Sequence, residues 1–117
     1  MIFVFGSNLA GIHGAGAALH ARNEYGAKLG VGIGRTGQSY AIPTKDERIK
    51  TLPLNRIEQY VNGFIAYAID HPELKFNITA IGCGLAGYTP MAIAPMFHDA
   101  PNNCILPDEF IAVLGVK

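Results

Sequence analysis

Two glycine-rich segments of this chain have the composition of ligand-binding turns. The first runs from Gly6 to Gly16 in "GSNLAGIHGAG", and the second runs from Gly82 to Thr89 in "GCGLAGYT". Each follows an apolar stretch and precedes a helical pattern. Glycines in such a position let the backbone approach a ligand closely, and the unpaired N–H groups of a helix's first turn attract anions. The two segments favour a phosphate-binding site, and close packing of helix on strand is the alternative.

The two segments lack the motifs of the common nucleotide-binding loops. In "GAGAAL", Leu19 stands where the dinucleotide fingerprint G-x-G-x-x-G requires its third glycine. The phosphate-loop pattern G-x-x-x-x-G-K-[ST] is also missing from the sequence. The spacing of the glycines alone therefore does not decide between packing and binding.

Three polar side chains in or near these turns are candidates for chemistry. Asn8 offers both a donor and an acceptor without charge, which suits a sugar, although asparagine also braces turns. His13 is placed to bind an anion or to act as a general acid, and the alternative is an exposed loop histidine. Asp46 is the nearest acidic candidate for activating a water. Lys45, Asp46 and Arg48 follow the second strand and could reach the edge of the cleft, and the alternative is that they form a solvated turn.

Cys83 lies inside the second turn. A thiol near a helix N-terminus can have a lowered pKa, but a packed, unreactive thiol is the default for this residue. Cys83 and Cys104 form no C-x-x-C pair, so both are expected to be reduced. Since His20, His71 and His98 show no metal-ligand spacing with either cysteine, we expect no metal site. No cofactor is expected either.

The hydrophobic pattern predicts alternating strands and helices. Residues 1–5 form an apolar run typical of a buried strand, and residues 54–69 carry an apolar stripe at helical spacing. The other expected elements are a helix at about 15–25, a loop at 27–37, strands at 39–44, 76–82 and 103–106, and helices at about 90–98 and 107–114. We expect Pro43 to end the second strand, and Thr89 and Pro90 to begin a helix.

This order of elements predicts an α/β domain with a small, mainly parallel sheet. In such a sheet, the turns that leave the carboxyl ends of the strands lie along one edge, where open α/β sheets bind ligands. Both glycine-rich turns follow strands, so they are expected to border one cleft.

Length and composition exclude several classes of protein. The 117 residues suit one domain, residues 1–117, and half of them are hydrophobic, which supplies a core. Nine basic residues balance nine acidic ones without a basic block, so no nucleic-acid partner is expected. No apolar run approaches the roughly 20 residues of a membrane span, and no signal peptide is recognisable. These features predict a cytoplasmic protein with no membrane contact.

The segments "SNLAGIHGAGAALHARNEYG" and "AIGCGLAGYT" resemble the two ligand loops of macro domains, which bind ADP-ribose. The segment "IGCGLAG" is most similar to the corresponding segment in the macro-domain branch that includes ADP-ribose phosphate ester phosphatases and terminal ADP-ribose-glutamate hydrolases. The order and spacing agree over about residues 1–106. The resemblance implies a three-layer α/β/α domain that binds ADP-ribose or an ADP-ribosylated substrate. It leaves open a hydrolase acting on the distal ribose and a non-catalytic reader.

The resemblance also implies roles for individual residues. Asn8 would bind the distal ribose, and Tyr88 would pack against it. The first turn would border ribose and diphosphate with Gly14, Ala15 and Gly16. Backbone N–H groups of the second turn would wrap the diphosphate, and the residues implied there are Gly82, Cys83, Gly84, Leu85, Ala86 and Gly87.

Three departures from the family pattern bear on function. Macro domains carry an aspartate, on a strand before the asparagine strand, that reads the adenine amino group, and no counterpart precedes Asn8. Ala86 stands where the glutamate hydrolases have an acidic residue. Arg35 and Gln38 stand near the place of their nucleophilic lysine, and arginine stays protonated, so a lysyl covalent route is not expected.

Overall fold

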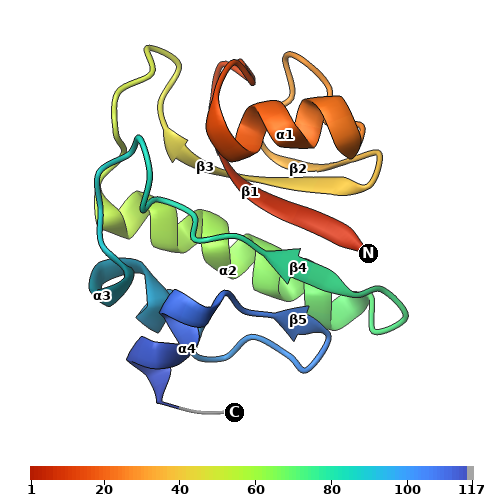
Figure 1. Cartoon of the computed structure of the whole chain (residues 1–117), viewed down its shortest axis with the longest axis vertical. Helices are drawn as coiled ribbons and strands as arrows, with labels where there is room; N and C mark the ends of the chain where they lie inside the picture. Colours follow the sequence, from red (N-terminus) through yellow and green to blue (C-terminus); the bar gives the residue numbers. More distant parts are fainter. Residues whose placement is uncertain (116–117) are drawn as a thin grey trace.

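The computed structural model describes residues 1–115, in which strands and helices alternate along the chain (Figure 1). The described strands are β1 (Ile2–Asn8), β2 (Gly34–Thr36), β3 (Ser39–Lys45), β4 (Phe76–Ile78) and β5 (Cys104–Ile105). The described helices are α1 (Gly16–Glu24), α2 (Leu54–Asp70), α3 (Pro90–Ile93) and α4 (Asp108–Leu114), with a 3-10 turn at Ala94–Phe97.

The five strands form one sheet in the order β2-β3-β1-β4-β5. β1 lies in the middle and runs parallel to both β3 and β4, and β5 is parallel to β4. Only the pair β2–β3 is antiparallel among these described strands. The expected small, mainly parallel sheet is therefore confirmed.

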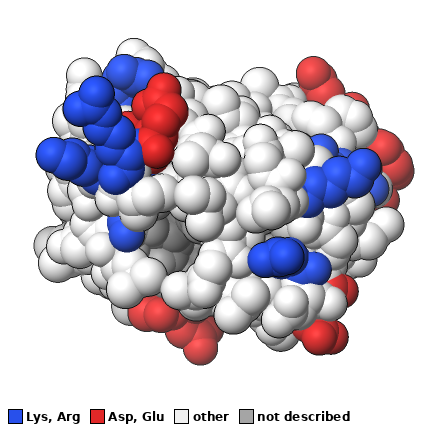
Figure 2. All heavy atoms as spheres, turned by 90° about the horizontal axis from the view of Figure 1, so that it is seen from above, with Lys and Arg blue, Asp and Glu red and all other residues white. Residues whose placement is uncertain are grey.

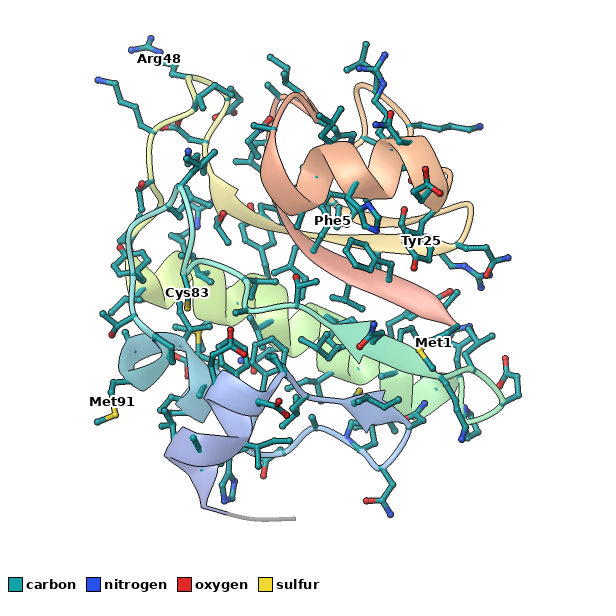
Figure 3. The ribbon with its side chains drawn as sticks, in the orientation of Figure 1. Met1, Phe5, Tyr25, Arg48, Cys83 and Met91 are labelled. Atoms are coloured by element: carbon teal, nitrogen blue, oxygen red, sulfur yellow. The ribbon has the colours of Figure 1, made fainter. Side chains whose placement is uncertain are left out.

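Alternate residues of β1 serve the two faces of the sheet. Ile2 and Val4 join the large core cluster with α2, α4 and the 3-10 turn, whereas Phe3 and Phe5 join a smaller cluster with α1. This follows from the period of two of a β-strand. Figure 3 shows Phe5 and Tyr25 between β1 and α1. Both faces are buried, which explains the continuous apolar run in β1.

α2 has the length and the buried face that its sequence predicts. Its buried residues recur three or four positions apart and are Ile57, Val61, Phe64, Ile65 and Ala68. Full burial of a side chain as large as Phe64 contributes about 1.5–3 kcal/mol. The helix ends at Asp70 because His71 precedes a proline and avoids helical geometry.

Two expected strand ends are wrong. β1 continues past residue 5 through Gly6 and Ser7 to Asn8, so the first turn begins later than expected. β3 continues through Pro43 to Lys45. The proline is tolerated because it pairs with Ser7 immediately before an irregularity in the register, where a missing N–H interrupts no regular ladder.

Three further expected elements differ from the structure. The expected loop at 27–37 contains β2, which pairs with β3 across a two-residue turn at Gly37 and Gln38. Gly37 has a φ of +57°, a backbone conformation that glycine adopts without strain. β4 is shorter than the expected strand at 76–82, and the expected helix at 90–98 changes to a 3-10 turn that contains Pro95.

The carboxyl ends of β1, β3 and β4 lie together at one edge of the sheet. β1 leads into α1 on one face, whereas β3 leads into α2 on the other (Figure 1). Of the helices within residues 1–115, none combines the length and the apolar composition that a bilayer crossing requires.

Candidate functional site

A cavity of about 570 Å³ opens at this edge of the sheet. Its walls come from three segments, at residues 6–18, 44–49 and 79–86, which follow β1, β3 and β4. In Figure 2 the hollow is seen from above, with basic side chains to one side of it. The cavity lies beside the carboxyl ends of β1 and β3, two neighbouring strands whose following helices cover opposite faces of the sheet. Open α/β sheets bind ligands at such a point.

The first glycine turn forms one wall of the cavity. Gly14 and Ala15 line it, followed by Gly16, Ala17 and Ala18, which are the first residues of α1. Ala15 is the N-cap and makes no side-chain capping bond, and the first turn of α1 contains no acidic residue. The leading N–H groups of α1 therefore have neither an intrahelical nor a capping partner. The partial positive charge of these unpaired N–H groups makes this wall suitable for binding an anion.

The second glycine turn forms the opposite wall. Gly82, Gly84, Leu85 and Ala86 line the cavity, and Leu85 is three-quarters exposed. Within residues 1–115, the backbone N–H groups of Gly84, Leu85 and Ala86 take part in no hydrogen bond. These N–H groups therefore have no partner among the described residues, and their contact with a diphosphate stays a prediction.

Three residues expected in this wall do not line the cavity. The N–H groups of Cys83, Gly87 and Tyr88 donate within the turn, to the carbonyls of residues 80, 84 and 82. The Tyr88 hydroxyl donates to the Leu52 carbonyl at 2.8 Å, and its ring packs against the large core cluster. Tyr88 is thus held away from the cavity lining, and its contact with a ribose stays a prediction.

The Cys83 thiol lies on the core side of the turn (Figure 3). It donates a weak hydrogen bond to the Ile81 carbonyl at 3.5 Å. Burial, with a smaller contribution from the negative charge of Glu109, raises the pKa of Cys83. The pKa is thus shifted in the direction opposite to that of an activated thiolate, and the packed thiol is the interpretation that holds.

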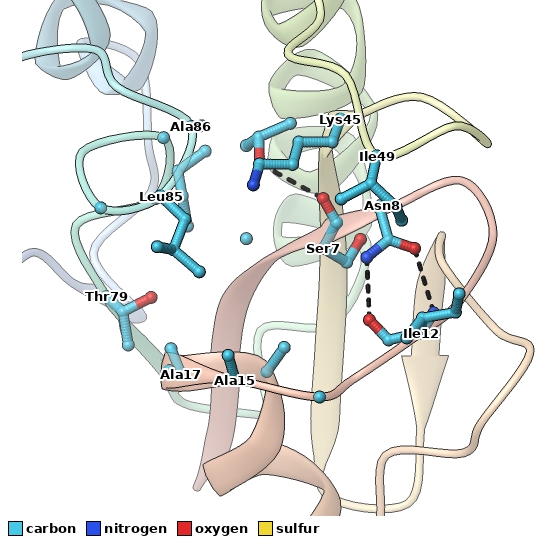
Figure 4. A pocket seen from close by; sticks show the side chains of 18 of the residues that line it. Ser7, Asn8, Ile12, Ala15, Ala17, Lys45, Ile49, Thr79, Leu85 and Ala86 are labelled. Atoms are coloured by element: carbon cyan, nitrogen blue, oxygen red, sulfur yellow. Dashed lines mark hydrogen bonds between the residues drawn. The ribbon is translucent and has the colours of Figure 1, made fainter.

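Lys45 places a positive charge in the cavity. It is the last residue of β3 and is partly buried, and its side chain extends towards the turn that carries Leu85 and Ala86 (Figure 4). Of the two alternatives considered for Lys45, the place at the edge of the cleft agrees with the structure and the solvated turn does not. Arg35 and Gln38 do not line the cavity. Arg35 instead bonds to the Gly37 carbonyl and to the Tyr67 hydroxyl.

Asn8 lines the cavity and also braces the first turn. Its Oδ1 accepts from the Ile12 N–H at 3.0 Å, and its Nδ2 donates to the Ile12 carbonyl at 2.8 Å (Figure 4). Because the amide can make further hydrogen bonds, the bracing role does not exclude contact with a ligand. The structure is compatible with both of the roles considered for Asn8.

His13 is wholly buried, so the expected exposed loop histidine is wrong. It does not line the cavity, and its Nε2 lies within hydrogen-bond distance of the carbonyl oxygens of Lys28 and Val31. A ring held in this way has no access to a ligand in the cavity. The proposed general acid therefore has no structural support.

Asp46 also lies outside the cavity lining. Its Oδ1 accepts from the N–H groups of Lys50 and Arg48, at 3.0 and 2.8 Å. The Lys50 bond is the main cause that lowers the pKa of Asp46. A carboxylate that is occupied in a surface turn is poorly placed to activate a water in the cavity, so the expected role of Asp46 is not supported.

Several lining residues were not identified from the sequence. Ser7, Thr44 and Thr79 line the cavity at or just after the ends of three strands. The Thr44 hydroxyl donates to the Ser7 carbonyl and that of Thr79 to the Val4 carbonyl, so these groups also hold the strand ends together. Only Thr44 stands at a strand end that the sequence predicts, since Ser7 lies two residues after the expected strand at 1–5 and Thr79 lies inside the expected strand at 76–82.

No group of three or more His, Cys, Asp or Glu side chains within residues 1–115 is placed to hold a metal ion. Comparisons of this chain with protein-family models, curated proteins and solved structures found no match.

Proposed function

We propose that this chain binds ADP-ribose or a related nucleotide in the cavity between its two glycine-rich turns, as a single macro-like domain with a three-layer α/β/α arrangement. The observation that carries the proposal is the convergence of both turns on one cavity. The residues whose backbone N–H groups lack a partner in the second turn and at the start of α1 line this cavity together with Lys45. Such a donor set matches a diphosphate.

The size and lining of the cavity suit a nucleotide. Its volume of about 570 Å³ lies within the range of sites that enclose small ligands, roughly 300–1,000 Å³. Ile12 and Ile49 line it and are about half exposed, so they offer apolar surface for a ribose or base. Asn8 offers its remaining hydrogen-bonding capacity to a sugar hydroxyl.

Between the two roles that the resemblance leaves open, the lining favours a reader of ADP-ribose or of ADP-ribosylated protein. Among the described residues that line the cavity there is no Asp, Glu, His or Cys. Lys45 is the one ionisable side chain in this lining. A hydrolase would have to rely on the Lys45 amine or on groups of the substrate itself.

Calorimetry tests the proposal directly. Titration with ADP-ribose is expected to give measurable heat, with weaker binding of AMP and of ribose 5-phosphate, because each of them fills only part of the donor set. Absence of heat with all three compounds would reject the proposed function. If ADP-ribose binds, incubation with ADP-ribosyl ester and ribose-phosphate substrates separates the two roles: unchanged substrate supports a reader, and release of ADP-ribose supports a hydrolase.

A further inference from the structure

A third glycine-rich segment, "KLGVGIG" at residues 28–34, packs beneath the first ligand turn. We propose that this segment is a brace for the turn at residues 8–14, and that His13 is the positioning residue that fastens the two together. The inference rests on the proposed function, because its main consequence is the affinity of the cavity for a nucleotide.

The brace and the turn touch through their backbones. A Cβ added to Gly32 would overlap the backbone of Asn8, and one added to Gly11 would overlap the backbone of Gly30. The Gly30 N–H donates to the Gly11 carbonyl at 2.8 Å, and the Ser7 hydroxyl donates to the Gly32 carbonyl. No side chain fits between the two segments, so glycine at these positions is a requirement of the contact.

His13 adds the side-chain connection. Its Nε2 lies 3.0 Å from the Lys28 carbonyl oxygen and 3.1 Å from that of Val31. Both partners are acceptors, so Nε2 carries the hydrogen and shares it between them. Nδ1 is buried without a hydrogen-bond partner, and the ring packs edge-on against Phe5 with 5.4 Å between the ring centroids. The polar contribution of His13 therefore lies wholly in its bond to the brace.

The position of His13 couples this bond to the cavity. It follows Ile12, whose N–H and carbonyl both bond to the Asn8 amide, and it precedes Gly14, which lines the cavity. Anchoring His13 therefore fixes the backbone on either side of it. A wall that is ordered before binding loses less conformational entropy when the ligand arrives, and the affinity is correspondingly higher.

Three variants test the inference. His13→Leu fills the buried site without a donor, and His13→Gln places an N–H near the position of Nε2. Phe110→Leu is the matched control, since it removes volume from a fully buried residue of α4 that belongs to the other core cluster. For each variant we would measure ADP-ribose affinity by calorimetry and amide hydrogen exchange by NMR.

His13→Leu is expected to weaken ADP-ribose binding tenfold or more and to speed exchange at Gly11, Ile12 and Gly30, whose N–H groups bond within the two segments. His13→Gln is expected to recover part of both effects. Phe110→Leu is expected to lower Tm and to leave the affinity and the exchange at these amides unchanged. If His13→Leu does not fold, His13→Asn replaces it, because its shorter amide cannot reach the brace.

Two results would overturn the inference: wild-type affinity and exchange in His13→Leu, or an equal loss of affinity in Phe110→Leu. If the wild-type protein does not bind ADP-ribose, the proposed function fails and hydrogen exchange alone decides on the brace. Faster exchange confined to residues 8–14 and 28–32 then supports it. Unchanged exchange, or faster exchange throughout the chain, rejects it.

Discussion

Asn8 and Ile12 share two hydrogen bonds across the first glycine-rich turn, one in each direction between the side-chain amide of Asn8 and the backbone of Ile12. The Asn8 side chain is buried, yet it borders the cavity (Figure 4). An amide has two N–H hydrogens and two acceptor lone pairs, so half of its capacity is unused. The same residue can therefore hold the turn and contact a sugar.

Asn8→Ala is expected to reduce both stability and binding. Removing the amide leaves two backbone groups of Ile12 without their partners, at a cost of about 1–3 kcal/mol in the free energy of unfolding. Denaturant titration measures this loss, and calorimetry measures the accompanying loss of ADP-ribose affinity. Asn77→Ala, at an exposed position of β4, is the matched control and is expected to change neither. Wild-type stability in Asn8→Ala would show that the two bonds do not hold the turn.

Alanine at Gly14 and Gly84 separates ligand binding from packing. A Cβ at Gly84 would meet nothing within 4 Å, and one at Gly14 would meet only the Ile12 side chain at 4.0 Å. Neither residue has a positive φ. We therefore expect both variants to fold with wild-type Tm and to bind ADP-ribose at least tenfold more weakly, because each added methyl enters the space of the ligand.

Gly63→Ala in α2 is the control for these two variants. A Cβ there also meets nothing within 4 Å, and alanine at a helix interior is expected to stabilise the protein by roughly 0.5–1 kcal/mol. Its affinity should be unchanged. If the Gly14 and Gly84 variants bind as tightly as the wild type, the glycines serve packing or chain geometry rather than a ligand.

The charge of Lys45 is expected to contribute to affinity. Lys45→Ala should weaken ADP-ribose binding about fivefold, which corresponds to the roughly 1 kcal/mol of a solvent-exposed ion pair. It should also flatten the dependence of affinity on salt. Lys75→Ala, an exposed lysine just before β4, is the control. Equal affinity in Lys45→Ala and the wild type would place the bound phosphates away from this side chain.

Lys45→Arg then distinguishes a role of the positive charge in binding from a role of the Lys45 amine as a nucleophile. Arginine keeps the positive charge but cannot act as an amine nucleophile. Retained affinity and the absence of turnover in both proteins are expected for a reader. Turnover by the wild type that disappears in Lys45→Arg, with binding retained, would instead show that the protein is a hydrolase that uses the amine.

The sequence predicted most reliably the features that depend on nearby residues. The limits of α2 were predicted to within one residue at its carboxyl end, because the positions of Ile57, Val61 and Phe64 already define a buried face. β2 was missed because residues 34–36 have little strand propensity of their own. They become a strand only by pairing with β3.

The same distinction holds for the candidate site. The glycines and Asn8 could be selected from the sequence because their residue types are unusual at the end of a strand. For Lys45 the sequence left the edge of the cleft and a solvated turn as alternatives, because its place in the cavity depends on β3 continuing past Pro43 and ending beside β1. The burial of His13 depends on a segment 15 to 18 residues later in the chain. The ligand itself remains a prediction.

The cysteines give a pH-dependent prediction that does not depend on a ligand. Burial raises the pKa of the Cys104 thiol from its ordinary value of 9.0 to about 11, and it also raises the pKa of Cys83. A raised folded-state pKa means that folding favours the neutral thiol. This contribution to stability is complete below pH 9 and is lost as the pH rises through about 11.

Alkylation rates measured against pH test this directly on single-cysteine proteins. In Cys83→Ala the remaining Cys104 is expected to react slowly at pH 8 and to reach half of its limiting rate near pH 11, because only the thiolate is nucleophilic. In Cys104→Ala the remaining Cys83 should also titrate above the ordinary value. Denaturant titrations at pH 8 and pH 10 should show a smaller loss of stability in Cys104→Ala than in the wild type. Rapid alkylation of folded Cys83→Ala at pH 8 would contradict the burial of Cys104.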